Sequence, residues 1–217
     1  MKGLLVKDLR LFLQQKKFFM VLLLVAVILN YNSDGTFIIG YLTVIGSFFV
    51  LSTIGYDEHG NSFAFLMTLP VMRKTYAREK YLFGFLLGGG EWLVATIISL
   101  IFKLVREGNV SLSDFFMEAL LFIPIFVVLT VIMIPFQLKF GGEKGRMAMI
   151  LAFGIAFLIG FLAVKGFEIA GKDLGQMVEK LSTLHIGLLE AICFAIAIGA
   201  TVVSCLISSR IMERKEF

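Results

Sequence analysis

Few side chains in this sequence could carry out chemistry, and they lie far apart. The two cysteines, Cys193 and Cys205, lie in one apolar run, about 18 Å apart if that run is a helix, which is too far for a disulfide bond. The two histidines, His59 and His185, fall in segments that the charge pattern below assigns to opposite sides of a membrane. We therefore expect no catalytic residue and no metal site.

One segment approaches the glycine-rich motif that binds nucleotide phosphates. Gly55, Gly60 and Ser62 match the spacing of G-x-x-x-x-G-K-[ST], but Asn61 replaces the lysine. The segment also follows a long apolar run, where a phosphate-binding loop follows a β-strand. We expect no cofactor in this chain, so any energy for work must come from a partner protein or an ion gradient.

Glu91 lies in the middle of an apolar run, "LLGGGEWLVA". A carboxylate inside a membrane is costly, so it should face the interior of the helix bundle or a wet cavity. Two roles stay open for Glu91. It either lines a translocation path and attracts cationic groups of a substrate, or makes a structural hydrogen bond.

The composition places these residues in a membrane. The chain is 59% hydrophobic and 17% charged, whereas soluble domains are about half apolar and a quarter charged. Its apolar runs match the thickness of a bilayer, and in lipid each must form a helix to satisfy its backbone. We predict one all-α integral membrane domain, residues 1–217, with six transmembrane helices. The expected spans are 18–33, 36–56, 82–102, 115–138, 147–164 and 186–209.

The charges predict the orientation. Of the 20 Lys and Arg residues, fifteen fall in the N-terminal segment, the 57–80 and 139–146 connections and the C-terminal tail, and five in the other connections. By the positive-inside rule both termini are cytoplasmic. The net charge of +4 is too small to indicate nucleic-acid binding, so the expected non-protein partner is membrane lipid.

Two connecting segments have helical patterns outside the spans. Residues 1–17 should form an amphipathic helix in the membrane surface, with Leu5, Leu9 and Phe12 on its apolar face. Residues 165–185 should form an external helix, which either caps an exit or lies passively at the surface.

The cytoplasmic 57–80 connection predicts a short helix with an apolar face. Phe63, Leu66, Met67 and Pro70 follow a helical spacing, with Ser62 or Asn61 as N-cap. Pro70 should end this helix. The bases that follow, suited to anionic lipid head groups, are Arg73, Lys74, Arg78 and Lys80. The residues alone leave open whether the apolar face docks on another protein, on the membrane or on the chain's own helices.

Two stretches carry a family resemblance: "MKGLLVKDL" at 1–9 and "YDEHGNSFAFLMTLPVMRKTYAREKYL" at 56–82. They resemble the permease subunits of type-2 bacterial ABC (ABC-2) exporters. More narrowly, they look like the membrane subunits of the staphylococcal phenol-soluble modulin exporter and related antimicrobial-peptide exporters. The length and the expected topology fit this group over the whole chain.

The resemblance implies that the 57–80 connection carries a coupling helix seated in a groove of a separate ATPase. The implied docking side chains are Phe63, Phe65, Leu66, Met67 and Leu69. Asp57 and Glu58 would flank that helix, and Arg73 and Lys74 would hold its exit at the membrane. Two cytosolic ABC ATPase subunits would bind the ATP and Mg²⁺. A second six-span permease subunit, identical or paralogous, would complete a dimeric pathway in the bacterial plasma membrane.

The expected cargo is an amphipathic or antimicrobial peptide leaving the cell. One alternative is an exporter of sodium or small drugs with the same architecture, with which Glu91 is compatible. Another is a non-transporting membrane immunity or anchor protein, which would bind a partner without moving a substrate.

Overall fold

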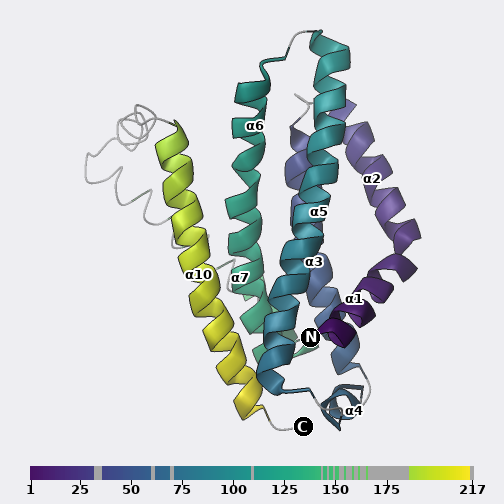
Figure 1. Cartoon of the computed structure of the whole chain (residues 1–217), viewed down its shortest axis with the longest axis vertical. Helices are drawn as coiled ribbons and strands as arrows, with labels where there is room; N and C mark the ends of the chain where they lie inside the picture. Colours follow the sequence, from purple (N-terminus) through teal and green to yellow (C-terminus); the bar gives the residue numbers. More distant parts are fainter. Residues whose placement is uncertain are drawn as a thin grey trace.

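The computed structural model describes residues 1–31, 36–59, 62–68, 71–108, 110–142 and 186–215, with scattered residues between 144 and 165. Every regular element in these residues is a helix, which agrees with the expected all-α class (Figure 1). The helices are α1 (Lys2–Gln14), α2 (Lys16–Tyr31), α3 (Phe37–Glu58), α4 (Ser62–Thr68), α5 (Arg73–Glu107), α6 (Leu112–Leu120), α7 (Phe122–Phe140) and α10 (Ile186–Arg214).

Four stretches of the described chain are long and apolar enough to cross a membrane: α3, most of α5, α6 with α7, and most of α10. The pair α1 and α2, bent by 61°, would make a fifth if it counts as one span. The six-span count therefore stays a prediction. Most of the expected span 147–164 and of the external helix 165–185 lies outside the described residues.

α3 is the most buried of these candidate spans and forms the centre of the bundle. It packs on α2, α5 and α7, and α10 packs on α5 and α7 at the side opposite α2 (Figure 1). Gly88 permits the close approach of α5 and α7, because a Cβ at this position would overlap the ring of Phe126. Such glycine contacts are typical of helices packed within a membrane.

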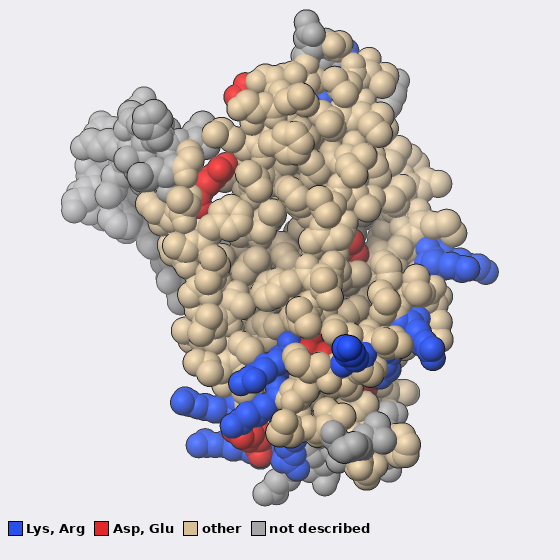
Figure 2. Space-filling model, viewed as in Figure 1, with Lys and Arg blue, Asp and Glu red and all other residues tan. Residues whose placement is uncertain are grey.

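The two ends of the bundle differ in charge. Both termini lie toward the end that carries α4, and the turn between α5 and α6 lies at the opposite end (Figure 1). On the face shown in Figure 2, most Lys and Arg side chains gather toward the α4 end. This distribution follows the charge asymmetry of the sequence, so the end that carries α4 is the one that the sequence predicts to be cytoplasmic.

Candidate functional site

The short helix expected in the 57–80 connection is present as α4, and one of its aromatic rings faces the bundle. Phe63 is only 6% exposed, and its ring meets the ring of Tyr76 on α5 edge to face, with centroids 5.1 Å apart. Leu66 packs against the same hydrophobic core. These contacts fix α4 on the chain's own helices.

The next aromatic residue of α4 points away from the bundle. Phe65 is 70% exposed, although α4 holds its backbone in place and the Thr68 hydroxyl donates to its carbonyl at 2.7 Å. Of the predicted docking side chains, the structure therefore places Phe63 inside and Phe65 outside. Leu69 and the side chain of Met67 lie outside the described residues.

The C-terminus supports the base of α4. The Lys215 amine donates to Glu58 Oε1 at 2.8 Å and to the Leu138 carbonyl at 3.0 Å. The same amine lies 5.7 Å from the centre of the Phe63 ring. At this distance a cation is attracted to the π-electrons of an aromatic ring. Glu58, predicted to flank the coupling helix, thus joins the end of α3 to the C-terminus.

The predicted exit residues Arg73 and Lys74 also contact the C-terminus. The Arg73 guanidinium donates to the carbonyls of Glu213 and Lys215, at 3.2 and 2.9 Å. The Lys74 amine lies 2.8 Å from Glu213 Oε1. These bases therefore connect the start of α5 to the end of α10, in addition to any contact with lipid.

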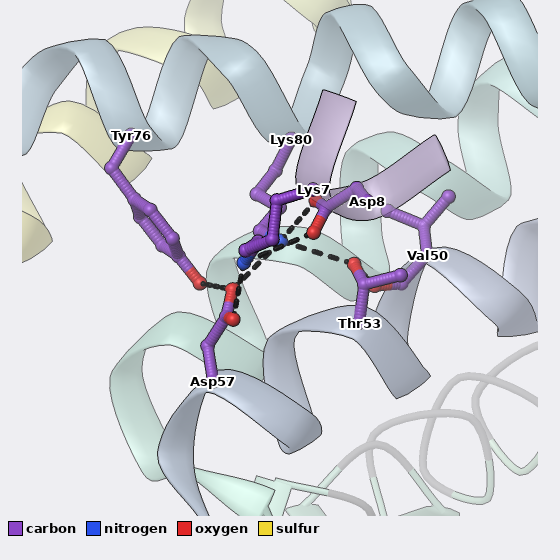
Figure 3. Close-up of polar contacts among 7 residues, drawn as sticks. All are labelled: Lys7, Asp8, Val50, Thr53, Asp57, Tyr76 and Lys80. Atoms are coloured by element: carbon purple, nitrogen blue, oxygen red, sulfur yellow. Dashed lines mark hydrogen bonds and ion pairs between the residues drawn. The ribbon is translucent and has the colours of Figure 1, made fainter. Parts of the chain in front are cut away.

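Polar and ionisable side chains from three helices meet in one group (Figure 3). We call this group the buried charge cluster: Lys7, Asp8, Thr53, Asp57, Tyr76 and Lys80. It brings together α1, α3 and α5, so residues far apart in the sequence form one polar network.

Lys80 lies at the centre of the buried charge cluster and is fully buried. Its amine donates to Asp8 Oδ2, lies 2.9 Å from Asp57 Oδ2, and donates to Thr53 Oγ1 at 3.1 Å. The Thr53 hydroxyl donates in turn to the Val50 carbonyl at 2.8 Å. A buried ammonium requires such pairing because its desolvation costs several kcal/mol.

Two further groups bind Asp57. The Lys7 amine donates to Asp57 Oδ1 and lies 3.0 Å from Asp8 Oδ1. The Tyr76 hydroxyl donates to Asp57 Oδ2 at 2.9 Å. Tyr76 thus touches Phe63 with its ring and Asp57 with its hydroxyl, so the support of α4 is continuous with the buried charge cluster.

The expectation that Lys80 binds lipid head groups is wrong, because its amine is enclosed between α1 and α3. Sequence reasoning also missed Asp8, which pairs with Lys80 across 72 positions. The available signals were weak: one acid among the bases of 1–17, and a tyrosine four residues before Lys80, on the same helical face.

A second site surrounds Glu91 on α5. Its carboxylate rests against Gly46 of α3, where a side chain would collide with it. Neither carboxylate oxygen has a hydrogen-bond partner among the described residues, although both are buried. Glu91 therefore does not make the structural hydrogen bond considered for it with any of the described residues. Its role in a substrate path stays a prediction.

Glu91 borders a groove of about 470 Å³ between α1, α2, α3 and α5, which we call the Glu91 groove. Leu5, Leu9 and Phe12, the expected apolar face of the N-terminal helix, form part of its lining. The sequence predicted that this face lies in the membrane surface, which stays a prediction; in the structure the same three residues line a groove that contains an acid.

One comparison with known proteins indicates a transport role. A family model described as ABC-2 family transporter protein matches residues 3–213. No curated protein and no solved structure matches the chain significantly. Because the family model covers nearly the whole chain, the protein belongs to the ABC-2 family of transporter proteins, membrane components that work with ABC ATPases.

Proposed function

We propose that this chain is the permease subunit of an ATP-driven ABC exporter in the bacterial plasma membrane, with both termini in the cytoplasm. Two cytosolic ABC ATPase subunits bind ATP and Mg²⁺ and drive it. A second permease subunit, identical or paralogous, completes the pathway, because one small bundle encloses little volume. Family membership and the basic α4 end of the bundle support this proposal.

The observation that carries the proposal is that Phe65 is exposed on α4, a helix whose opposite side is packed on the bundle. Phe63 and the Lys215 contacts hold α4 to the bundle, while Phe65 is left without cover by the described chain. Exposed aromatic side chains on preorganised elements are typical anchors of protein interfaces, because little ordering entropy is lost on binding. Phe65 is therefore the main docking residue for the ATPase, and Phe63 fixes the helix that presents it.

The buried charge cluster gives α4 a way to act on the bundle. A displacement of α4 would be transmitted to Tyr76 through the contact between its ring and that of Phe63. The Tyr76 hydroxyl is in turn hydrogen-bonded to Asp57. Asp57 joins Lys7 of α1 and Lys80 of α5. Because Lys80 and Asp57 are buried and paired, and Lys7 is partly buried beside them, the three helices resist separation and move together. ATP-driven closure of the ATPase dimer would thereby shift α1 and α5.

The proposed cargo is an amphipathic or antimicrobial peptide leaving the cell. A carboxylate in an apolar groove, as at Glu91, offers the complementary chemistry for a cationic group on an apolar body. Export of sodium or small drugs uses the same architecture and stays an alternative. A non-transporting immunity or anchor protein is the weaker alternative, because the family is one of transport components.

The test is copurification with the ATPase. The tagged permease would be expressed in its host with Phe65 unchanged, replaced by Glu or replaced by Leu, and retained proteins identified by mass spectrometry. We expect an ABC ATPase with wild type and with Phe65→Leu, which keeps an apolar side chain. Phe65→Glu should reduce its recovery at least tenfold, because a carboxylate would be desolvated at the interface.

Equal recovery of the ATPase with Phe65→Glu would contradict the docking role of Phe65. Absence of any ABC ATPase from wild-type preparations, with and without added ATP, would contradict the exporter function and favour the anchor alternative.

A further inference from the structure

The Glu91 groove combines an apolar wall with one acid. The bend of 61° between α1 and α2 places apolar side chains of both helices around the same space. Phe12 of α1 and Phe19 of α2 form part of that wall, with ring centroids 4.5 Å apart. Phe83 of α5 lies on the same groove.

The acid in the groove has no polar partner among the described residues. Glu91 is the one ionisable residue among the described residues that line it. Both carboxylate oxygens are buried without a hydrogen-bond partner in the described chain. A lipid acyl chain could fill the groove but would leave this acid unsatisfied at a cost. A cation would fill the apolar volume and satisfy the carboxylate at once.

The volume indicates the size of that cation. About 470 Å³ lies within the range of pockets that hold drug-sized ligands, which are mostly apolar with a few polar groups. The aromatic rings of Phe12, Phe19 and Phe83 would add favourable contacts with a cation or with aromatic groups attached to it.

We propose that the Glu91 groove binds a small lipophilic organic monocation that enters from the membrane, with its charge at the Glu91 carboxylate. That the bound cation is cargo rests on the proposed transport function, and such a cargo corresponds to the small-drug alternative given there and not to the peptide. The binding itself is a property of this chain and requires no ATPase.

Equilibrium binding to the full chain in phosphatidylcholine nanodiscs tests this proposal. The probe is tritiated tetraphenylphosphonium, and tetraphenylborate serves as an anion of the same shape. Empty nanodiscs measure partitioning into lipid. We expect saturable binding of the phosphonium, without saturable binding of the borate. Glu91→Gln should weaken phosphonium binding at least tenfold, because the amide keeps the shape and removes the charge.

Two adjacent glycines provide a matched pair of variants. Gly90 lines the groove and Gly89 does not, and an added Cβ meets no atom within 4 Å at either position. Gly90→Leu should fill part of the groove and weaken phosphonium binding at least tenfold, whereas Gly89→Leu should bind like wild type. Glu118→Gln is the control for loss of an acid elsewhere, since Glu118 pairs with Lys103 at 3.0 Å.

Any one of these results would overturn the proposal: no saturable phosphonium binding, equal affinity for the borate, or wild-type affinity in either Glu91→Gln or Gly90→Leu. An amphipathic lysine peptide that binds and is weakened by Glu91→Gln, where the phosphonium does not bind, would also overturn the assignment to a small cation. All of these binding measurements use the permease without the ATPase. A failure to bind the phosphonium therefore leaves the copurification result, and with it the proposed function, unaffected.

Discussion

The rings of Phe63 and Tyr76 meet edge to face, with centroids 5.1 Å apart, and join α4 to the bundle. The other end of Tyr76 donates to Asp57 at 2.9 Å. The proposed coupling helix therefore rests on a residue that is itself bound into the buried charge cluster. This arrangement separates the residues that hold α4 from the residue that it presents.

Phe63→Ala should destabilise the protein by about 3 kcal/mol, because it removes a buried ring and leaves a cavity. SDS-titrated unfolding in detergent micelles measures this change. Phe65→Ala should change the unfolding free energy by less than about 0.5 kcal/mol, since its ring is exposed. It should nevertheless lose ATPase copurification. Equal destabilisation by the two substitutions would contradict the placement of Phe63 inside and Phe65 outside.

Lys80→Met should cost about 3–5 kcal/mol, because it leaves Asp8 and Asp57 buried with one fewer cation. The same unfolding measurement applies. Adding Asp8→Asn and Asp57→Asn to Lys80→Met should recover part of the loss, since the two carboxylates that pair with Lys80 are then neutral. No recovery in this triple variant would show that the cost does not come from unpaired charge.

Lys74→Met is the matched control for loss of a lysine ion pair at the same end of the bundle. Its pair with Glu213 is about half exposed, at 52% and 46% for the two side chains. Solvent screens such pairs, so we expect a cost of about 0–1 kcal/mol.

Gly88→Ala should destabilise the protein by about 1–3 kcal/mol, because the new Cβ would overlap the Phe126 ring and force α5 away from α7. The adjacent Gly89→Ala meets no atom within 4 Å and should be neutral or stabilising, since alanine favours helix over glycine. Thermal unfolding followed by size-exclusion chromatography checks both variants. A destabilising Gly89→Ala with a neutral Gly88→Ala would contradict the packing of α5 on α7.

Cysteine labelling tests the proposed orientation. In a background with Cys193 and Cys205 replaced by Ser, Thr68→Cys on α4 should react with a membrane-impermeant maleimide only after the cells are opened. Ser113→Cys, in α6 near the other end of the bundle, should react in intact cells. The reverse pattern would place α4 outside and exclude its contact with a cytosolic ATPase.

Local patterns were sufficient to predict most helices of the bundle but not their exact ends. The expected third span began at Leu82, whereas α5 begins at Arg73. Apolar runs mark the part of a helix that lies in lipid, and a polar turn can continue the same backbone hydrogen bonds beyond it. The helical spacing of Phe63 and Leu66 correctly predicted that they lie on one face of α4, because both pack in the same hydrophobic core.

What covers each face could not be predicted from local patterns. The spacing of Phe63 and Leu66 predicts an apolar face equally well for a partner's groove and for the chain's own bundle, and the structure shows the bundle. The pairing of Lys80 with Asp8 depends on how α1 packs against α5, which no short pattern encodes. Glu91 was recognisable as an acid in an apolar run, but its groove required the bend between α1 and α2.

Photocrosslinking from α4 tests the central claim most directly. A photoreactive p-benzoylphenylalanine would be placed at position 65, or at position 63 as the inward control, and irradiated in living host cells. The account predicts an adduct between position 65 and an ABC ATPase, with position 63 crosslinking within the permease itself. Adducts of position 65 with lipid or with the permease alone, under every nucleotide condition, would contradict the account.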